Sequence, residues 1–211
     1  MSTLDRVQRL LARLYDIDDD LDVRSFVRSD DEVREAADPE GQRREVLLVR
    51  DGPDGAEVTL YLDRDALDRS AEGDFDAWCL VLEGVSHLVY VAHRAAREVP
   101  VRQLELELQA DVDKYATSLL AGFGAGLIRE RSELLRRRLF DEVSFIDDAE
   151  SEVGQRYRTA NREAARYAAS LERRFLSDER EGSRGVREMV RELRRFYRAD
   201  LEQKLRWTGP T

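Results

Sequence analysis

Cysteine, lysine and long apolar runs are scarce in this sequence of 211 residues. Cys79 is the single cysteine, which excludes an intramolecular disulfide and a zinc site built from several cysteines. The apolar run over residues 77–82 is broken by Glu83, far short of a membrane span, and the first residues lack the basic-then-apolar order of a secretory signal. These absences predict a cytoplasmic protein that does not attach to a membrane.

Positive charge is carried almost entirely by arginine, because Lys114 and Lys204 are the only lysines. The formal net charge is -10 and the sequence pI is about 4.9, which opposes binding to nucleic acid or to anionic membranes. The charge is uneven along the chain. Residues 1–125 hold 15 basic and 28 acidic residues, whereas residues 126–211 hold 20 and 17, so an acidic first part precedes an arginine-rich second part.

Apolar periodicity predicts a mainly helical chain. Leu4, Val7, Leu11 and Leu14 are spaced as on one face of a helix, and Ser29 with Glu32 has the form of a capping box before a short helix. We expect this short helix over residues 30–37, an extended segment over 23–28, and long helices over 75–97, 101–121, 126–141, 152–176 and 184–206. Two apolar runs, 46–49 and 58–62, flank a connector rich in turn residues and predict a β-hairpin.

These elements predict a predominantly helical α+β protein. An N-terminal helix and a small β-hairpin pack beside a helical bundle, and the last two helices form a C-terminal helical hairpin. The glycine-rich residues 122–126 lie where the charge balance changes. We therefore expect two regions: 1–121, acidic and α+β, and 122–211, helical and arginine-rich, packed on the first.

A polar stripe follows one face of the predicted helix over residues 75–97. Glu83, His87 and Tyr90 recur at spacings of three and four, so they share that face. Three further ionisable residues lie on the next helix and could join them in a pocket: Glu105, Asp111 and Lys114. This pocket is the candidate for an enzyme or a metal-binding protein.

The stripe also has a structural interpretation, which we favour. A mostly buried helix needs polar contacts between helices to satisfy its polar groups. Glu83 and His87 form a single Glu-x-x-x-His, whereas di-iron helices carry Glu-x-x-His twice, so we expect no metal and no cofactor. Cys79 and His87 are about 12 Å apart along the helix axis, which excludes a direct Cys–His catalytic pair.

Arginines recur at helical spacing in the last two helices. They could meet carboxylates or phosphates, and we take them as the candidate binding residues: Arg158, Arg162, Arg166, Arg187, Arg191, Arg194 and Arg198. Interspersed glutamates dilute this positive charge, so nucleic acid is the weaker alternative. The sequence predicts a non-enzymatic protein-interaction or regulatory protein whose partner is another protein or a second copy, with a homodimer as the simplest case.

Overall fold

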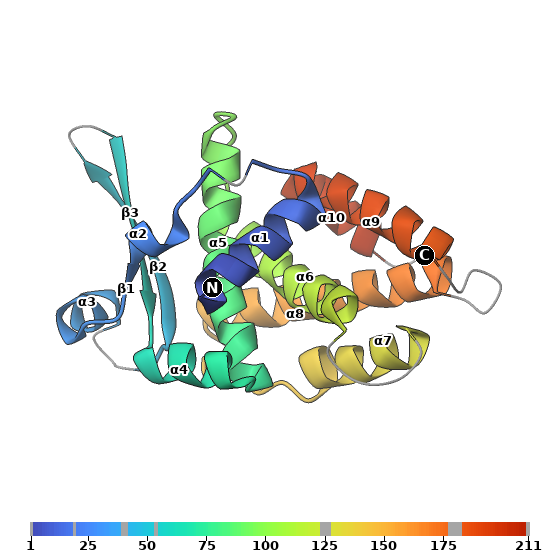
Figure 1. Cartoon of the computed structure of the whole chain (residues 1–211), viewed down its shortest axis with the longest axis horizontal. Helices are drawn as coiled ribbons and strands as arrows, with labels where there is room; N and C mark the ends of the chain where they lie inside the picture. Colours follow the sequence, from blue (N-terminus) through green and yellow to red (C-terminus); the bar gives the residue numbers. More distant parts are fainter. Residues whose placement is uncertain are drawn as a thin grey trace. The chain divides into compact units, whose positions relative to one another are not determined.

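The computed structural model describes residues 2–18, 20–38, 42–52, 55–122, 128–176 and 183–209 (Figure 1). Most of these residues are helical, and three short strands among them form one sheet. The predominantly helical α+β class expected from the sequence is therefore confirmed.

Contacts within the chain group its residues into two units. The first unit comprises residues 1–12 and 17–100, and the second comprises residues 13–16 and 101–211. This division falls ahead of the boundary that the sequence places after residue 121. Grouping by contacts does not test independent folding, so the two predicted regions stay a prediction. Residues 123–127 of the glycine-rich stretch lie outside the described part of the chain.

The first unit contains the sheet and most of the shorter helices. Its elements in chain order are α1 (Thr3–Tyr15, whose last turn belongs to the second unit), α2 (Val23–Phe26), β1 (Val27–Arg28), α3 (Asp31–Ala37), β2 (Glu45–Gly52), β3 (Gly55–Leu62), α4 (Arg64–Glu72) and α5 (Phe75–Ala95). The strand order is β1-β3-β2. Strands β2 and β3 form the expected antiparallel hairpin, with Glu45 opposite Leu62, and β1 runs parallel to β3.

Helix α5 packs against this hairpin, at a face formed by alternate strand residues. Leu60 and Leu62 of β3 are fully buried. Gly84 of α5 lies against them, because a Cβ at this position would come within 3.0 Å of both leucines and within 2.8 Å of the Glu45 side chain. The absence of a side chain at residue 84 therefore sets how closely the helix approaches the sheet.

Two local expectations for the first unit are wrong, and one helix was missed. The segment 23–28 is not extended throughout, because α2 occupies its first residues and β1 only its last two. The cap of α3 is Asp30 rather than Ser29, since the Asp30 carboxylate accepts from the Val33 backbone N–H at 3.0 Å. Helix α4 was not expected, although Asp63 caps its start and Gly73 ends it in the left-handed conformation.

The second unit is built from helices. Its elements are α6 (Gln103–Ala121), α7 (Ile128–Arg136), the π-helical segment η1 (Arg137–Asp141), α8 (Glu152–Phe175), α9 (Ser183–Arg198) and α10 (Leu201–Thr208). Helix α8 packs along α6 and also contacts α7, α9 and α10 (Figure 1). Ala160, Ala164 and Ala168 on α8 are buried, and their small side chains permit this close approach between helices.

The last predicted helix, 184–206, is wrong as a single element. The chain leaves the helical path at Ala199, and α9 and α10 are separate helices. Asp200 causes the second one to begin, because its carboxylate accepts from the Gln203 backbone N–H at 2.8 Å.

Within the described residues, α5 is the one helix that is long and apolar enough to cross a membrane by length and composition. In this structure 61% of the apolar 18-residue stretch of α5 that meets this criterion is buried inside the protein. The buried core helix of a soluble protein meets the same criterion, so this composition does not identify a membrane span.

Candidate functional site

Helix α9 separates its apolar and basic residues onto opposite faces. Met189, Leu193 and Phe196 have no exposed surface and hold the helix against the second unit. Six of its 16 residues are arginines and two are glutamates. Four of the arginines form what we call the α9 arginine face, each of them exposed to solvent: Arg184, Arg187, Arg191 and Arg195.

Arg187 and Arg191 form the centre of this face, one helical turn apart. Neither makes an ion pair or hydrogen bond with any residue that the structure describes. At the ends of the face, Arg184 pairs with Glu188 at 3.2 Å, and the Arg195 guanidinium lies 4.3 Å from the centre of the Trp207 ring. Among the described residues, the central two guanidinium groups are thus the ones of this face without a protein partner.

Arg194 and Arg198 of α9 act inside the second unit. The Arg194 guanidinium donates to the backbone carbonyl of Leu14 at 2.8 Å, and that of Arg198 donates to the carbonyl of Tyr15 at 2.9 Å. These carbonyls belong to the last turn of α1, where a helix has no internal donors for them. Both arginines therefore cap α1, at the end where positive charge is also favoured by the helix dipole.

The three candidate arginines of α8 also have partners within the second unit. Arg158 donates to the carbonyls of Asp147 and Gly154 and stacks over the Phe145 ring at 4.7 Å. Arg162 and Arg166 both bond to one carboxylate oxygen of Glu163, at 3.0 and 2.9 Å.

Glu163 connects α8 to α10. Its second carboxylate oxygen accepts from the Thr208 hydroxyl at 2.8 Å. Burial opposes ionisation of this side chain, but the bonds from Thr208 and Arg162 outweigh it, so the pKa of Glu163 is lowered. A carboxylate is therefore held in place where the last helix meets α8.

A buried polar network that the sequence analysis missed lies at the centre of the second unit. Lys204 has no exposed surface, and its ammonium group donates to Gln109 Oε1 at 2.8 Å. The Gln109 amide donates in turn to the Asp113 carboxylate at 2.7 Å, and this carboxylate also accepts from the Tyr15 hydroxyl. Burial is the main cause that raises the pKa of Tyr15 well above its ordinary value. The sequence held one signal for this network. Lys204 lies three residues after Leu201 and four before Thr208, so it shares the buried face of α10 with both.

The three expected pocket residues on α6 have partners inside the second unit. The Glu105 carboxylate lies 3.9 Å from the Lys204 ammonium group and is 3% exposed. Lys114 pairs with Asp111 at 2.9 Å, one turn away on the same helix. The network of Lys204 therefore includes Glu105, whereas Lys114 and Asp111 form a local pair.

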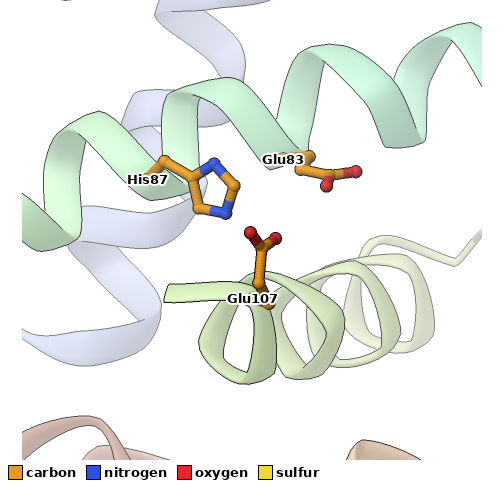
Figure 2. A group of neighbouring side chains, drawn as sticks. All are labelled: Glu83, His87 and Glu107. Carbon is orange, nitrogen blue, oxygen red and sulfur yellow. The ribbon is translucent and has the colours of Figure 1, made fainter. Parts of the chain in front are cut away.

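The other expected pocket residues lie on α5. Figure 2 shows Glu83 and His87 extending from the same side of this helix, as their spacing predicts. His87 is buried, and its Nδ1 lies 3.3 Å from a carboxylate oxygen of Glu45 on β2, a partner that the sequence analysis did not include. Tyr90 is fully buried, and the Arg94 guanidinium lies 5.7 Å from the centre of its ring.

Glu107 of α6 is the third side chain drawn in Figure 2. Within its own unit this buried carboxylate lies 3.7 Å from the Arg156 guanidinium of α8. The pocket of Glu83, His87 and Tyr90 with Glu105, Asp111 or Lys114 stays a prediction.

Comparison with known proteins gives no indication of function, so a function has to be argued from the residues described above. No protein-family model matches the chain, and no curated protein or solved structure matches it at a significant level.

Proposed function

We propose that this chain is a non-enzymatic protein-interaction protein that binds an acidic protein surface through the α9 arginine face. One observation carries the proposal. Arg187 and Arg191 stand side by side, exposed, without a carboxylate partner among the described residues, on a helix whose other face is buried.

Guanidinium groups suit this task because each can donate two parallel hydrogen bonds to one carboxylate. A rigid helix fixes the spacing of Arg187 and Arg191, so an acidic surface with carboxylates at a similar spacing is bound with little ordering of the main chain. Each exposed ion pair contributes only about 0.2–1 kcal/mol, so a specific interaction uses the whole face rather than one residue.

The charge balance favours an acidic protein over nucleic acid. The second unit holds 23 basic and 22 acidic residues, a net charge of +1, and Glu188 and Glu192 flank the arginine face. A duplex presents phosphates along its whole length and needs an extended positive surface. A few carboxylates on a protein require only the local pairs that this face offers.

Titration of a fluorescein-labelled oligoglutamate peptide, followed by fluorescence anisotropy, tests the proposal on the full chain. The α9 reversal, Arg187→Glu with Arg191→Glu, replaces two attractive pairs with two repulsive ones. We expect it to weaken peptide binding at least about tenfold, which corresponds to about 1.4 kcal/mol. Circular dichroism shows whether the variant keeps its helical content.

The matched control is Arg9→Glu with Arg13→Glu, which makes the same charge change at two exposed positions one turn apart on α1. It should leave peptide binding within about twofold of the unmodified protein, since only bulk charge changes. Equal losses in the control and the α9 reversal would refute the proposal. So would tighter binding to a labelled DNA duplex than to the peptide at the same salt concentration.

A further inference from the structure

A groove lies in the first unit between α3 and the sheet. Its volume is about 230 Å³, and it lies on the sheet face that carries Leu48 of β2 and Thr59 of β3, which are paired across the hairpin. Side chains alternate along a strand, so this face is opposite the one that buries Leu60 against α5. The groove is lined by Glu32, Val33, Ala36, Leu48, Arg50, Glu57 and Thr59.

Two carboxylates that line this groove have no ion pair among the described residues. Glu32 of α3 and Glu57 of β3 are exposed, and neither forms an ion pair with a described residue. Glu35 on α3 is likewise exposed and unpaired among the described residues, whereas Asp31 is paired with Arg34 at 3.4 Å. The lining also includes the apolar side chains of Val33 and Leu48.

This arrangement fits an arginine side chain. The guanidinium group can pair with a carboxylate of the lining while its apolar stem lies against the apolar lining residues, as long basic side chains do on apolar surfaces. Arg50 lies opposite Glu57 across the hairpin, so Glu32 on α3 is the carboxylate farther from this positive charge in the strand register.

We propose that the groove between α3 and the sheet holds the α9 arginine face of a second copy of this chain. The inference rests on the proposed function and names the partner of the same face. Its basis is charge complementarity: the first unit holds 12 basic and 23 acidic residues, a net charge of -11, and Arg187 and Arg191 are on the second unit. Each copy carries both surfaces, so one copy can supply the arginine face and another the groove.

Sedimentation velocity of the full chain over a concentration series tests this inference. The unmodified protein should associate reversibly, and added salt should weaken the association because its contacts are charged. The α9 reversal should raise the dissociation constant at least about tenfold. The groove reversal, Glu32→Arg with Glu57→Arg, should do the same, while Arg9→Glu with Arg13→Glu should leave it within about twofold.

Mixing the two reversed proteins is the decisive measurement. An acidic α9 face then meets a basic groove, and the unchanged α9 face of the groove variant meets the unchanged groove of the other copy. An equimolar mixture should therefore associate where each variant alone does not. Failure of the mixture to associate, or a monomeric unmodified protein at every concentration, would overturn the inference.

The two proposals fail in different ways. If the α9 reversal weakens oligoglutamate binding but leaves self-association unchanged, the second copy is the wrong partner and the acidic-surface function stands. If the α9 reversal changes neither, both proposals are wrong. Loss of self-association in the α9 reversal, with no effect of the groove reversal, would refute the groove as the docking site.

Discussion

Removing the ammonium group of Lys204 should destabilise the second unit more than most single substitutions. This group is fully buried, donates to Gln109 at 2.8 Å and lies 3.9 Å from the Glu105 carboxylate. It also lies 5.2 Å from the centre of the Phe196 ring, within the range of a cation–π contact. Lys204→Met keeps an unbranched apolar stem but removes the charge and the donor.

The expected loss in the free energy of unfolding can be estimated from the charged group that stays buried after the substitution. Removing one partner of a buried ion pair costs about 3–5 kcal/mol, because the other charge stays buried without compensation. The 3.9 Å separation from Glu105 and the apolar fit of methionine place this case at the low end, about 3 kcal/mol. Lys114→Met is the control, since its ammonium group is partly exposed to solvent and pairs with Asp111 one turn away on α6, so its loss should cost less than that of Lys204.

Urea unfolding followed by circular dichroism measures both costs. Combining Glu105→Gln with Lys204→Met completes a double-mutant cycle, in which we expect the two losses of stability not to add, because the two side chains interact. The reasoning is refuted if Lys204→Met costs no more than Lys114→Met, or if the losses from the two substitutions are additive.

Two further predictions concern α8 and the buried tyrosines. Gly154→Ala should lower the free energy of unfolding by about 2 kcal/mol in urea titrations, because the new Cβ would lie 1.8 Å from the backbone oxygen of Asp148; unchanged stability would show that this approach is not required. Burial raises the pKa of Tyr115 to about 12, so its phenol is protonated in both states below pH 10. Between pH 10 and 12 the unfolded state loses this proton first, and the free energy of unfolding should fall, by about 1.4 kcal/mol at pH 11 from this residue. Tyr115→Phe should remove that part of the fall between titrations at pH 9 and pH 11, and an equal fall in the variant would contradict the assignment.

The helices with one regular apolar face were predictable from the sequence, and α4 was not. Periodicity reports burial on one side, and α5, α6 and α8 bury such faces along their length. In α4 only Ala66 and Ser70 are buried, so no apolar pattern marks it. Its caps, Asp63 and Gly73, were the available signal.

The break between α9 and α10 was hidden for a related reason. Tyr197, Leu201 and Leu205 keep a spacing of four across it, so the apolar pattern continues through two separate helices. Only Asp200, a good capping residue, indicates a new start.

Arginine spacing identified the exposed face but not the role of each residue. Arg187 and Arg191 are exposed as their pattern suggests, whereas Arg194 donates to a carbonyl 180 positions earlier in the chain. Backbone carbonyls carry no sequence signature, so such a contact is invisible until the chain is folded. The contact between Glu45 and His87 was equally invisible, because Glu45 belongs to β2 and lies 42 residues before His87 in the sequence.

Capping of α1 by Arg194 and Arg198 has a consequence for the order in which the protein is completed during synthesis. Leu14 leaves the ribosome 180 residues before Arg194, which at about 5–20 residues per second is roughly 10–40 s. During this interval the last turn of α1 lacks its guanidinium donors, and Tyr15 lacks Tyr197, on which it stacks at 4.0 Å. For this interval the Tyr15 ring lacks its stacking partner and the α1 carbonyls can bond only to water, so this end of α1 gains its native contacts only after α9 has been synthesised.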